Sequence, residues 1–327
     1  MHLIIGGSGF IGTRLSKRLH KVNAQFQILD KVKSNTFPEL TQLCDIRDRD
    51  KLLSTATSAD VIINLAAEHR DDVRPKSLYD EVNVMGSQHV CDLAEAKGIN
   101  KIIFTSSVAV YGFAERGTDE SGKINPFNDY GRTKYEAELI YKAWQAKDPE
   151  NRTLVIVRPT VVFGEQNRGN VYNLLKQIAS GKFAMIGNGE NRKSMAYVEN
   201  VAAFLEFSNS MTAGVHTYNY IDKPDFDMNS LVIRVKQALG KEGKVGARIP
   251  YWIGMTAGYG FDLIAKISGK NLPISSIRIQ KFCKDSVYNT AFEKTGFRPP
   301  VDLQRAIDST INYEFVAKND GEVFYTE

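Results

Sequence analysis

The sequence predicts an α/β protein with a Rossmann-type doubly wound parallel sheet and a smaller, mostly helical C-terminal substrate lobe. Two observations lead to this prediction. Short apolar runs alternate with helical patterns through the first half, and a glycine-rich turn directly follows the first run. The chain has 327 residues, 43% hydrophobic and 24% charged, which is enough for a large core and two subdomains.

Five apolar runs are the predicted strands of the sheet. They are LII near residue 4, QFQILD ending at Asp30, VIINLAA from Val61, KIIFTSS from Lys101 and LVIVRP from Leu154. Because helical patterns lie between these runs, we expect parallel strands joined by right-handed crossovers. The runs are continuously apolar, which is typical of strands covered by helices on both faces.

The second half reads as a series of helices separated by short turn-rich links. The patterns are NVYNLLKQIASG, VENVAAFLEFSN, SLVIRVKQALG, YWIGMTAGYGFDLIAKI and LQRAIDSTINYEF. We therefore expect a dinucleotide-binding domain with the catalytic residues over 1–164, and a mainly substrate-binding lobe over 165–327. The two should pack around a cleft, since no long linker separates them.

The run from Tyr251 to Ile267 is apolar, but glycines, Asp262 and Lys266 interrupt it. A membrane span needs ~20 mostly apolar residues. The sequence therefore predicts a buried or subunit-facing helix here, with a homodimer as one expected assembly and no stable membrane insertion.

Composition and charge exclude several classes of protein. Lys and Arg number 42 against 38 Asp and Glu, without long blocks of one sign, so no nucleic-acid partner is expected. Cys44, Cys91 and Cys283 are far apart and odd in number, which favours reduced thiols, and no basic leader precedes the first apolar run, so we expect a cytoplasmic protein. His69 and His89 lack partners at metal-ligand spacing, so we expect surface positions for both and no metal.

The turn IIGGSGFIGTRL predicts a dinucleotide site. Its glycines follow a strand and open a helix, where they permit a tight turn and close approach of the backbone to a pyrophosphate. Asp30 follows about 20 residues later at the end of the next strand, where a carboxylate binds a ribose 2′-hydroxyl. Asp30 favours NAD over NADP, although Lys31 and Lys33 could temper that preference. The turn residues of this predicted NAD site are Gly6, Gly9, Phe10, Ile11 and Gly12.

The stretch DYGRTK places Tyr130 and Lys134 one turn apart at the start of a predicted helix, so both side chains share one face. A neighbouring ammonium favours the phenolate, and a desolvated tyrosine beside a lysine can give or take a proton near neutral pH. By itself this spacing also fits an ordinary tyrosine packed on a lysine stem.

Together, the glycine turn, the Tyr130–Lys134 pair and FTSSVAVYG from Phe104 to Gly112 resemble the extended short-chain dehydrogenase/reductase family, in its nucleotide-sugar epimerase/dehydratase branch. The resemblance covers most of the chain. It implies that Ser107, Tyr130 and Lys134 are catalytic: Ser107 hydrogen-bonds the sugar oxygen, Tyr130 moves the proton and Lys134 holds the nicotinamide ribose. It also implies cofactor contacts from Asp45, Ile46, Leu65, Ala66 and Ala67. For Tyr111 it implies a position in the sugar pocket, although a position in the hydrophobic core is an equally good expectation.

Two departures from the family pattern narrow the expected reaction. Val108 and Ala109 stand where related dehydratases carry acidic residues, which disfavours dehydration and leaves 4-epimerisation or reduction of a 4-keto sugar. Val161 stands where relatives often have an asparagine facing the substrate phosphates. Arginines suit phosphate binding, and the candidates for this role are Arg168, Arg192 and Arg278.

We therefore expect an NAD-dependent nucleotide-sugar 4-epimerase of surface-polysaccharide synthesis. The competing hypotheses are a 4-keto nucleotide-sugar reductase, a hydroxysteroid-type dehydrogenase and a non-catalytic dinucleotide sensor.

Overall fold

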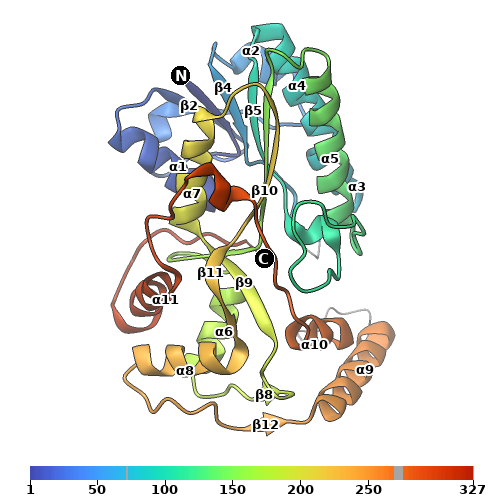
Figure 1. The fold of residues 1–327 in the computed structure, drawn as a ribbon, viewed down its shortest axis with the longest axis vertical. Coiled ribbons are helices and arrows are strands. Elements are labelled where there is room, and N and C mark those ends of the chain that lie inside the picture. The colour runs from blue at the N-terminus through green and yellow to red at the C-terminus, as the bar shows by residue number, and fades with distance from the viewer. Residues whose placement is uncertain (71–72, 269–274, 327) are drawn as a thin grey trace.

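The computed structural model describes residues 1–70, 73–268 and 275–326. Its centre is a seven-stranded parallel sheet in the order β10-β6-β5-β4-β1-β2-β3 (Figure 1). The strands are β1 (His2–Ile5), β2 (Phe26–Asp30), β3 (Thr41–Leu43), β4 (Val61–Asn64), β5 (Lys101–Thr105), β6 (Thr153–Pro159) and β10 (Gly214–Tyr220). The five predicted strands and their parallel pairing are confirmed.

The two strands at the edges of this sheet, β3 and β10, have no matching prediction. β3 has only three residues, and Gln42 and Leu43 in it are exposed. β10, with the sequence GVHTYNY, contains no continuous apolar run. An edge strand has a neighbour on one side only and is incompletely covered, so its sequence carries a weak strand signal.

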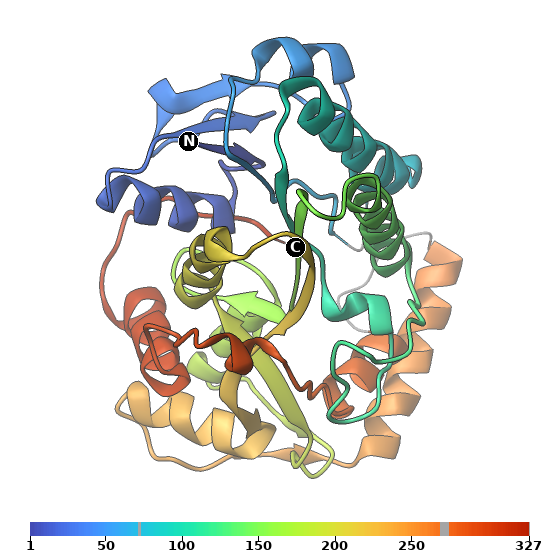
Figure 2. The same cartoon turned by 45° about the horizontal axis from the view of Figure 1, so that its top comes forward.

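Helices cover both faces of the sheet, as predicted. Helices α1 (Phe10–Lys21) and α7 (Val198–Phe207) pack together on one face, and α2 (Arg49–Thr55), α4 (Gly86–Lys97) and α5 (Asp129–Ala146) cover the other (Figures 1 and 2). Successive strand residues point to opposite faces. The side chains of β1 and its neighbours accordingly divide between two separate hydrophobic cores, one against each helical layer.

The smaller lobe contains most of the remaining helices and two small sheets. Its strands form the sheets β11-β9-β7 and β12-β8, and its own core is built from the helices around them. The elements are β7 (Val161–Phe163), α6 (Asn170–Ala179), β8 (Met185–Ile186), β9 (Arg192–Tyr197), β11 (Asp222–Asp227), α8 (Met228–Ala238), β12 (Arg248–Ile249), α9 (Tyr251–Ser268), α10 (Ser276–Cys283) and α11 (Leu303–Ile311). The five predicted helices are present as α6, α7, α8, α9 and α11. Since α7 and β10 pack with the first half, the Rossmann core extends beyond residue 164.

Helix α9 differs from its predicted environment. The run from Tyr251 to Ile267 is helical, but it is not buried: Trp252 is 71% exposed and Ile267 is 78% exposed. Among the described residues, no helix has the length and apolar character required to cross a membrane. The subunit-facing alternative stays a prediction.

Candidate active site

A cleft of about 1930 Å³ runs between the carboxyl ends of the sheet strands and the smaller lobe. Ligands of open α/β sheets bind at this edge. All the residues predicted to be catalytic or to contact the cofactor line the cleft. They are Gly6, Gly9, Phe10, Ile11, Gly12, Asp30, Asp45, Ile46, Leu65, Ala66, Ala67, Ser107, Tyr130 and Lys134.

The glycine turn has the geometry that a pyrophosphate requires. Gly6 has φ +78°, and a Cβ there would lie 2.5 Å from the backbone nitrogen of Ala66. Only glycine fits this position without a shift of the backbone. Gly9 is the N-cap of α1 and supplies no side-chain cap, so the first N–H groups of the helix are available to an anion. These residues fit an NAD pyrophosphate.

Asp30 lies at the end of β2 beside this turn. Its carboxylate accepts hydrogen bonds from the backbone nitrogens of Ser8 at 2.9 Å and Val32 at 3.0 Å. These bonds fix the orientation of the side chain at the cleft. Further along, the guanidinium of Arg47 hydrogen-bonds Asp45 at 2.7 Å and lowers the pKa of that carboxyl group. Asp45 is therefore charged and held in place at the expected adenine end.

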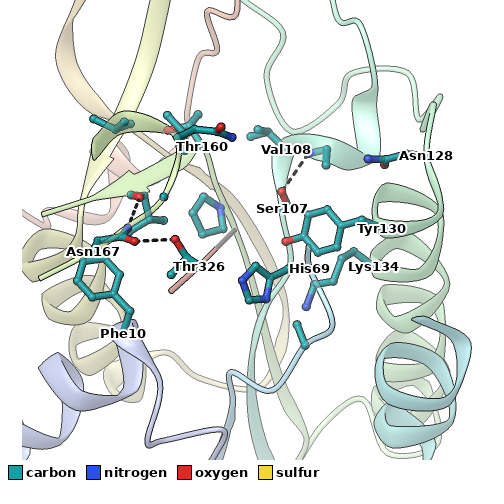
Figure 3. Close-up of a pocket in the computed structure, with 18 of the residues that line it drawn as sticks. Phe10, His69, Ser107, Val108, Asn128, Tyr130, Lys134, Thr160, Asn167 and Thr326 are labelled. Carbon is teal, nitrogen blue, oxygen red and sulfur yellow. Dashed lines mark hydrogen bonds between the residues drawn. The ribbon is translucent and has the colours of Figure 1, made fainter. Parts of the chain in front are cut away.

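Ser107, Tyr130 and Lys134 meet at the middle of the cleft (Figure 3). Ser107 follows β5 and caps a short 3₁₀ turn, where its hydroxyl accepts from the backbone nitrogen of Ala109 at 3.1 Å. Tyr130 is the second residue of α5, whose N-cap is Asn128. Burial raises the pKa of the Tyr130 phenol, and a hydrogen bond with Ser107 counteracts that shift. The structure thus brings together three residues predicted from separate segments.

The glycine within DYGRTK explains how α5 comes so close to Ser107. A Cβ on Gly131 would lie 2.4 Å from the carbonyl oxygen of Ala109. A larger residue would push the helix away from the 3₁₀ turn that follows Ser107. Gly131 therefore sets the separation between the tyrosine and the serine.

Lys134 is almost completely buried beside an acidic partner. Its side chain is 2% exposed, and its ammonium lies 4.2 Å from the centroid of the Phe104 ring. Burial lowers the pKa of Lys134 to about 7, although the charge of Glu138 one turn later raises it. Near neutral pH this lysine is therefore poised between its two protonation states.

Behind Lys134, a buried hydrogen-bond network joins α5 to β6. Glu138 accepts from Arg158 Nε at 2.8 Å and Nη2 at 2.5 Å, and from Ser106 Oγ at 2.6 Å. Arg158 also donates to the hydroxyl of Tyr111 at 2.6 Å, which in turn donates to Asn219 at 2.8 Å. Because both charges are buried and fully engaged, this network fixes α5 against the sheet.

The pKa of Lys134 leads to a testable effect of pH on stability. Lysine in an unfolded chain has a pKa of ~10.4. Between about pH 7 and this value the unfolded chain binds a proton that the folded chain does not, so the free energy of unfolding rises with pH. At about pH 6 the lysine is charged in both states, and the folded protein must bury that charge. Lys134→Met removes this cost and should stabilise the cofactor-free protein by a few kcal/mol. The estimate takes ~1.4 kcal/mol for each unit by which the pKa of Lys134 differs between the folded and unfolded chains.

Urea unfolding of the Lys134→Met variant and the wild type at about pH 6 and about pH 9 measures this effect. The stability gap should shrink as the pH rises. Lys142→Met is the matched control, since Lys142 lies two turns further along α5 with its side chain 37% exposed. An equal gap at both pH values would contradict a lowered lysine pKa.

The structure separates the four predicted substrate contacts. Only Arg278, on α10, lines the cleft. Tyr111 is buried in the network behind the cleft wall, so the core position holds for it. Arg168 is bound to Glu314 at 2.7 Å, and Arg192 is exposed at the start of β9, away from the cleft. Tyr111, Arg168 and Arg192 therefore do not line the cleft in which their substrate contacts were expected.

Sequence reasoning missed Lys193, next to Arg192. Alternate residues of a strand point to opposite sides, and Lys193 lines the cleft where Arg192 does not. Its ammonium donates to the carbonyl oxygens of Lys281 at 2.7 Å and Lys284 at 2.6 Å. Burial lowers the pKa of Lys193 to about 8. The strand period could have identified this residue, but only with the register of β9 known.

Two further residues of the cleft were not predicted. His69 lines it near Lys134 (Figure 3); its side chain is exposed, as expected from the sequence, but it faces the cleft, whose walls desolvate the imidazole and lower its pKa. Thr326 lines it from the C-terminal segment and donates to Asn167 at 2.6 Å. Neither position carries a local sequence signal, because each depends on how distant segments meet.

The fold and the cleft define a dinucleotide-dependent enzyme with a serine, a tyrosine and a lysine beside the cofactor site. The chain belongs to the NAD dependent epimerase/dehydratase family, whose model matches residues 2–219. NAD is accordingly its cofactor, as the sequence predicts. Among the described residues, no group of three His, Cys, Asp or Glu side chains is arranged to hold a metal ion, and the absence of a metal stays a prediction.

Individual relatives are similar over nearly the whole chain. N-acetyl-alpha-D-glucosaminyl-diphospho-ditrans,octacis-undecaprenol 4-epimerase of Escherichia coli O157:H7 is 48% identical, over 99% of this chain and 98% of that protein. The Candida albicans sterol-4-alpha-carboxylate 3-dehydrogenase is 27% identical, over 95% of this chain and 96% of that protein. A Thermotoga maritima UDP-glucose 4-epimerase solved with UDP-glucose has a TM-score of 0.74 at 19% identity, covering 95% of this chain and 97% of that one. The prediction of an enzyme of the epimerase type is confirmed.

Proposed function

We propose that the chain catalyses NAD-dependent 4-epimerisation of an N-acetylhexosamine joined through a diphosphate to a polyprenol lipid. The observation that carries this proposal is the 48% identity, over nearly the full length of both proteins, to an epimerase named for such a substrate. The proposal keeps the predicted reaction and the diphosphate-linked sugar, and replaces the nucleotide by a lipid. It retains the cytoplasmic location expected from the sequence.

The roles of the reaction-centre residues follow from their positions. Bound NAD would supply the chemistry of removing hydrogen from C4 of the sugar and returning it to the opposite face. Tyr130 takes the proton of the C4 hydroxyl and later returns it, and Ser107 hydrogen-bonds the same oxygen. Lys134, one turn along α5, stabilises the Tyr130 phenolate when it carries its proton.

Val108 and Ala109 line the cleft beside Ser107. Neither side chain can carry a proton, so this part of the wall offers none of the acid or base groups that elimination of water requires. The placement supports epimerisation over dehydration.

A diphosphate site is available on the lobe side of the cleft. Helix α6 begins there, with Gly169 as an N-cap that supplies no side-chain bond and Asn170 as its first residue, and both line the cleft. Its N-terminus favours an anion. Lys193 uses two of its three donors on carbonyl oxygens, which leaves one for a phosphate oxygen. Arg278 adds a further positive charge.

A direct comparison of substrates tests this function. The purified protein would be incubated with NAD and either detergent-dispersed GlcNAc-diphospho-undecaprenol or UDP-N-acetylglucosamine, and the released sugar would be identified by NMR. We expect GalNAc from the lipid-linked substrate, without net change in reduced cofactor. Turnover of UDP-N-acetylglucosamine alone would overturn the lipid assignment. Consumption of reduced cofactor in proportion to product would instead establish the 4-keto sugar reductase.

A further inference from the structure

The amphipathic pattern of helix α9 is inverted relative to an ordinary surface helix. The side of α9 that packs on the lobe carries small residues: a Cβ on Gly258 would lie 2.9 Å from Ser276 Cα of α10. The large apolar side chains face outward, and Trp252, Tyr259, Leu263 and Ile267 are separated by seven, four and four positions along one side of the helix. A surface helix normally turns its apolar stripe to the core.

The outward face of α9, here called the α9 face, is rich in large exposed apolar side chains. Figures 1 and 2 both place α9 at the outer edge of the molecule, beside α10. Large exposed apolar patches on soluble proteins mark contact with a partner or a membrane. The exposed apolar residues of the α9 face are Trp252, Ile253, Tyr259, Leu263, Ile264 and Ile267.

Helix α9 carries this apolar face and lines the active-site cleft with other residues. Asp262 and Ala265 line the cleft from α9 itself, and α10 supplies Arg278 and Lys281 to the same wall. Phe113 and Phe127 also line the cleft, and their exposed rings stack with centroids 4.8 Å apart. The ammonium groups of Lys281 and Lys284, at the end of α10, lie 4.7 Å from the ring centroid of Phe127 and 4.8 Å from that of Phe113. Exposed apolar side chains are therefore present where the cleft meets the end of α10 as well as on α9.

The chemistry of the α9 face fits a lipid bilayer. Trp and Tyr favour the membrane–water interface, and helices that lie in that plane combine such residues with aliphatic side chains and flanking basic residues. Lys266 on α9 is exposed, as is Lys284 just after α10. Positive charges at the edge of an apolar face are attracted to anionic lipid headgroups. A partner of this description is an anionic membrane surface.

We propose that the α9 face docks on an anionic lipid bilayer and so holds the cleft mouth at the level of the headgroups. The inference rests on the proposed function, because a sugar carried by a polyprenol must be reached while its lipid chain stays in the membrane. The helix lies in the interface and does not span the bilayer, in keeping with its charged residues and its contacts with α10.

The test is binding of the full-length protein to vesicles of phosphatidylethanolamine with about 30% phosphatidylglycerol, compared with pure phosphatidylcholine. The protein has two tryptophans, of which Trp144 is buried and Trp252 is exposed. We expect sedimentation with the anionic vesicles and quenching of Trp252 fluorescence by brominated lipid chains. The Leu263→Glu/Ile267→Glu double variant should bind at least about tenfold more weakly, because both charges would enter the apolar layer.

Val22→Glu is the matched control, since Val22 is 60% exposed at the end of α1, outside the α9 face. It should bind vesicles like the wild type. The double variant should retain its thermal unfolding midpoint and its turnover of a substrate that needs no bilayer, namely the detergent-dispersed lipid-linked sugar or UDP-N-acetylglucosamine. This readout keeps the two proposals distinct, because vesicle binding does not depend on which substrate is turned over.

Three outcomes would overturn the docking proposal. One is a wild-type protein that does not bind the anionic vesicles, whichever sugar it epimerises. Another is equal loss of binding in Val22→Glu. The third is a dimer in analytical ultracentrifugation that the double variant dissociates, which would show that the α9 face joins two copies of this chain.

Discussion

Replacement of Tyr130 by Phe should lower turnover by ~10² to 10⁴ while leaving the fold and the binding of NAD close to wild type. The substitution removes one hydroxyl, the only group of that side chain able to move the sugar proton. It keeps the aromatic ring, which lines the cleft from the first turn of α5. The measurement is the rate of C4 inversion of the lipid-linked sugar, or of UDP-N-acetylglucosamine if that is the substrate turned over.

Tyr135→Phe is the control for this variant. Tyr135 lies five residues further along the same helix. It is partly buried against the hydrophobic core that contains α1 and α7, and it does not line the cleft. Its loss of a hydroxyl should leave turnover unchanged. An undiminished rate for Tyr130→Phe would remove the phenol from the mechanism and shift the acid–base role to Ser107 or Lys134.

Glu138→Gln should destabilise the protein by ~3–5 kcal/mol, because it leaves the guanidinium of Arg158 buried without a counter-charge. The side chain of Glu138 is fully buried and that of Arg158 nearly so. Loss of the carboxylate also removes the charge that raises the pKa of Lys134, so the pH range in which Lys134 stays protonated should move downward. Urea unfolding and the pH dependence of turnover measure the two effects.

Glu136→Gln provides the comparison on the same helix. Glu136 pairs with Arg132 at 3.1 Å, but both side chains are more than a third exposed. Exposed ion pairs contribute ~0–1 kcal/mol, so this variant should unfold close to wild type. If both variants lost the same stability, the buried pair of Glu138 and Arg158 would have no special structural role.

The catalytic side of the cleft was predictable because its residues carry local signals. The glycine turn, Asp30 and the Tyr130–Lys134 spacing each follow from where a strand ends or a helix begins. In a doubly wound sheet all carboxyl strand ends meet at one edge. Motifs far apart in the sequence therefore converge in one cleft without any further information.

The substrate side was less predictable, as the arginines show. No sequence pattern distinguishes Arg278 from Arg168 and Arg192, yet of these three arginines only Arg278 lines the cleft. Their positions depend on the register of β9 and on which acidic group each arginine meets, such as Glu314 for Arg168. Lys193 and His69 reach the cleft for similar reasons, and no local pattern distinguishes them from surface residues.

The sequence by itself determined the five inner strands of the sheet and the glycine turn of the NAD site, because hydrophobic period and glycine position are local properties of the chain. The resemblance to a known family, not a local pattern, singled out Ser107 and grouped it with Tyr130 and Lys134. The tertiary structure decided which face of α9 is exposed, which basic residues line the cleft and that Glu138 is buried with Arg158. These features depend on packing between segments distant in sequence, and burial, charge pairing and pKa arise only from that packing.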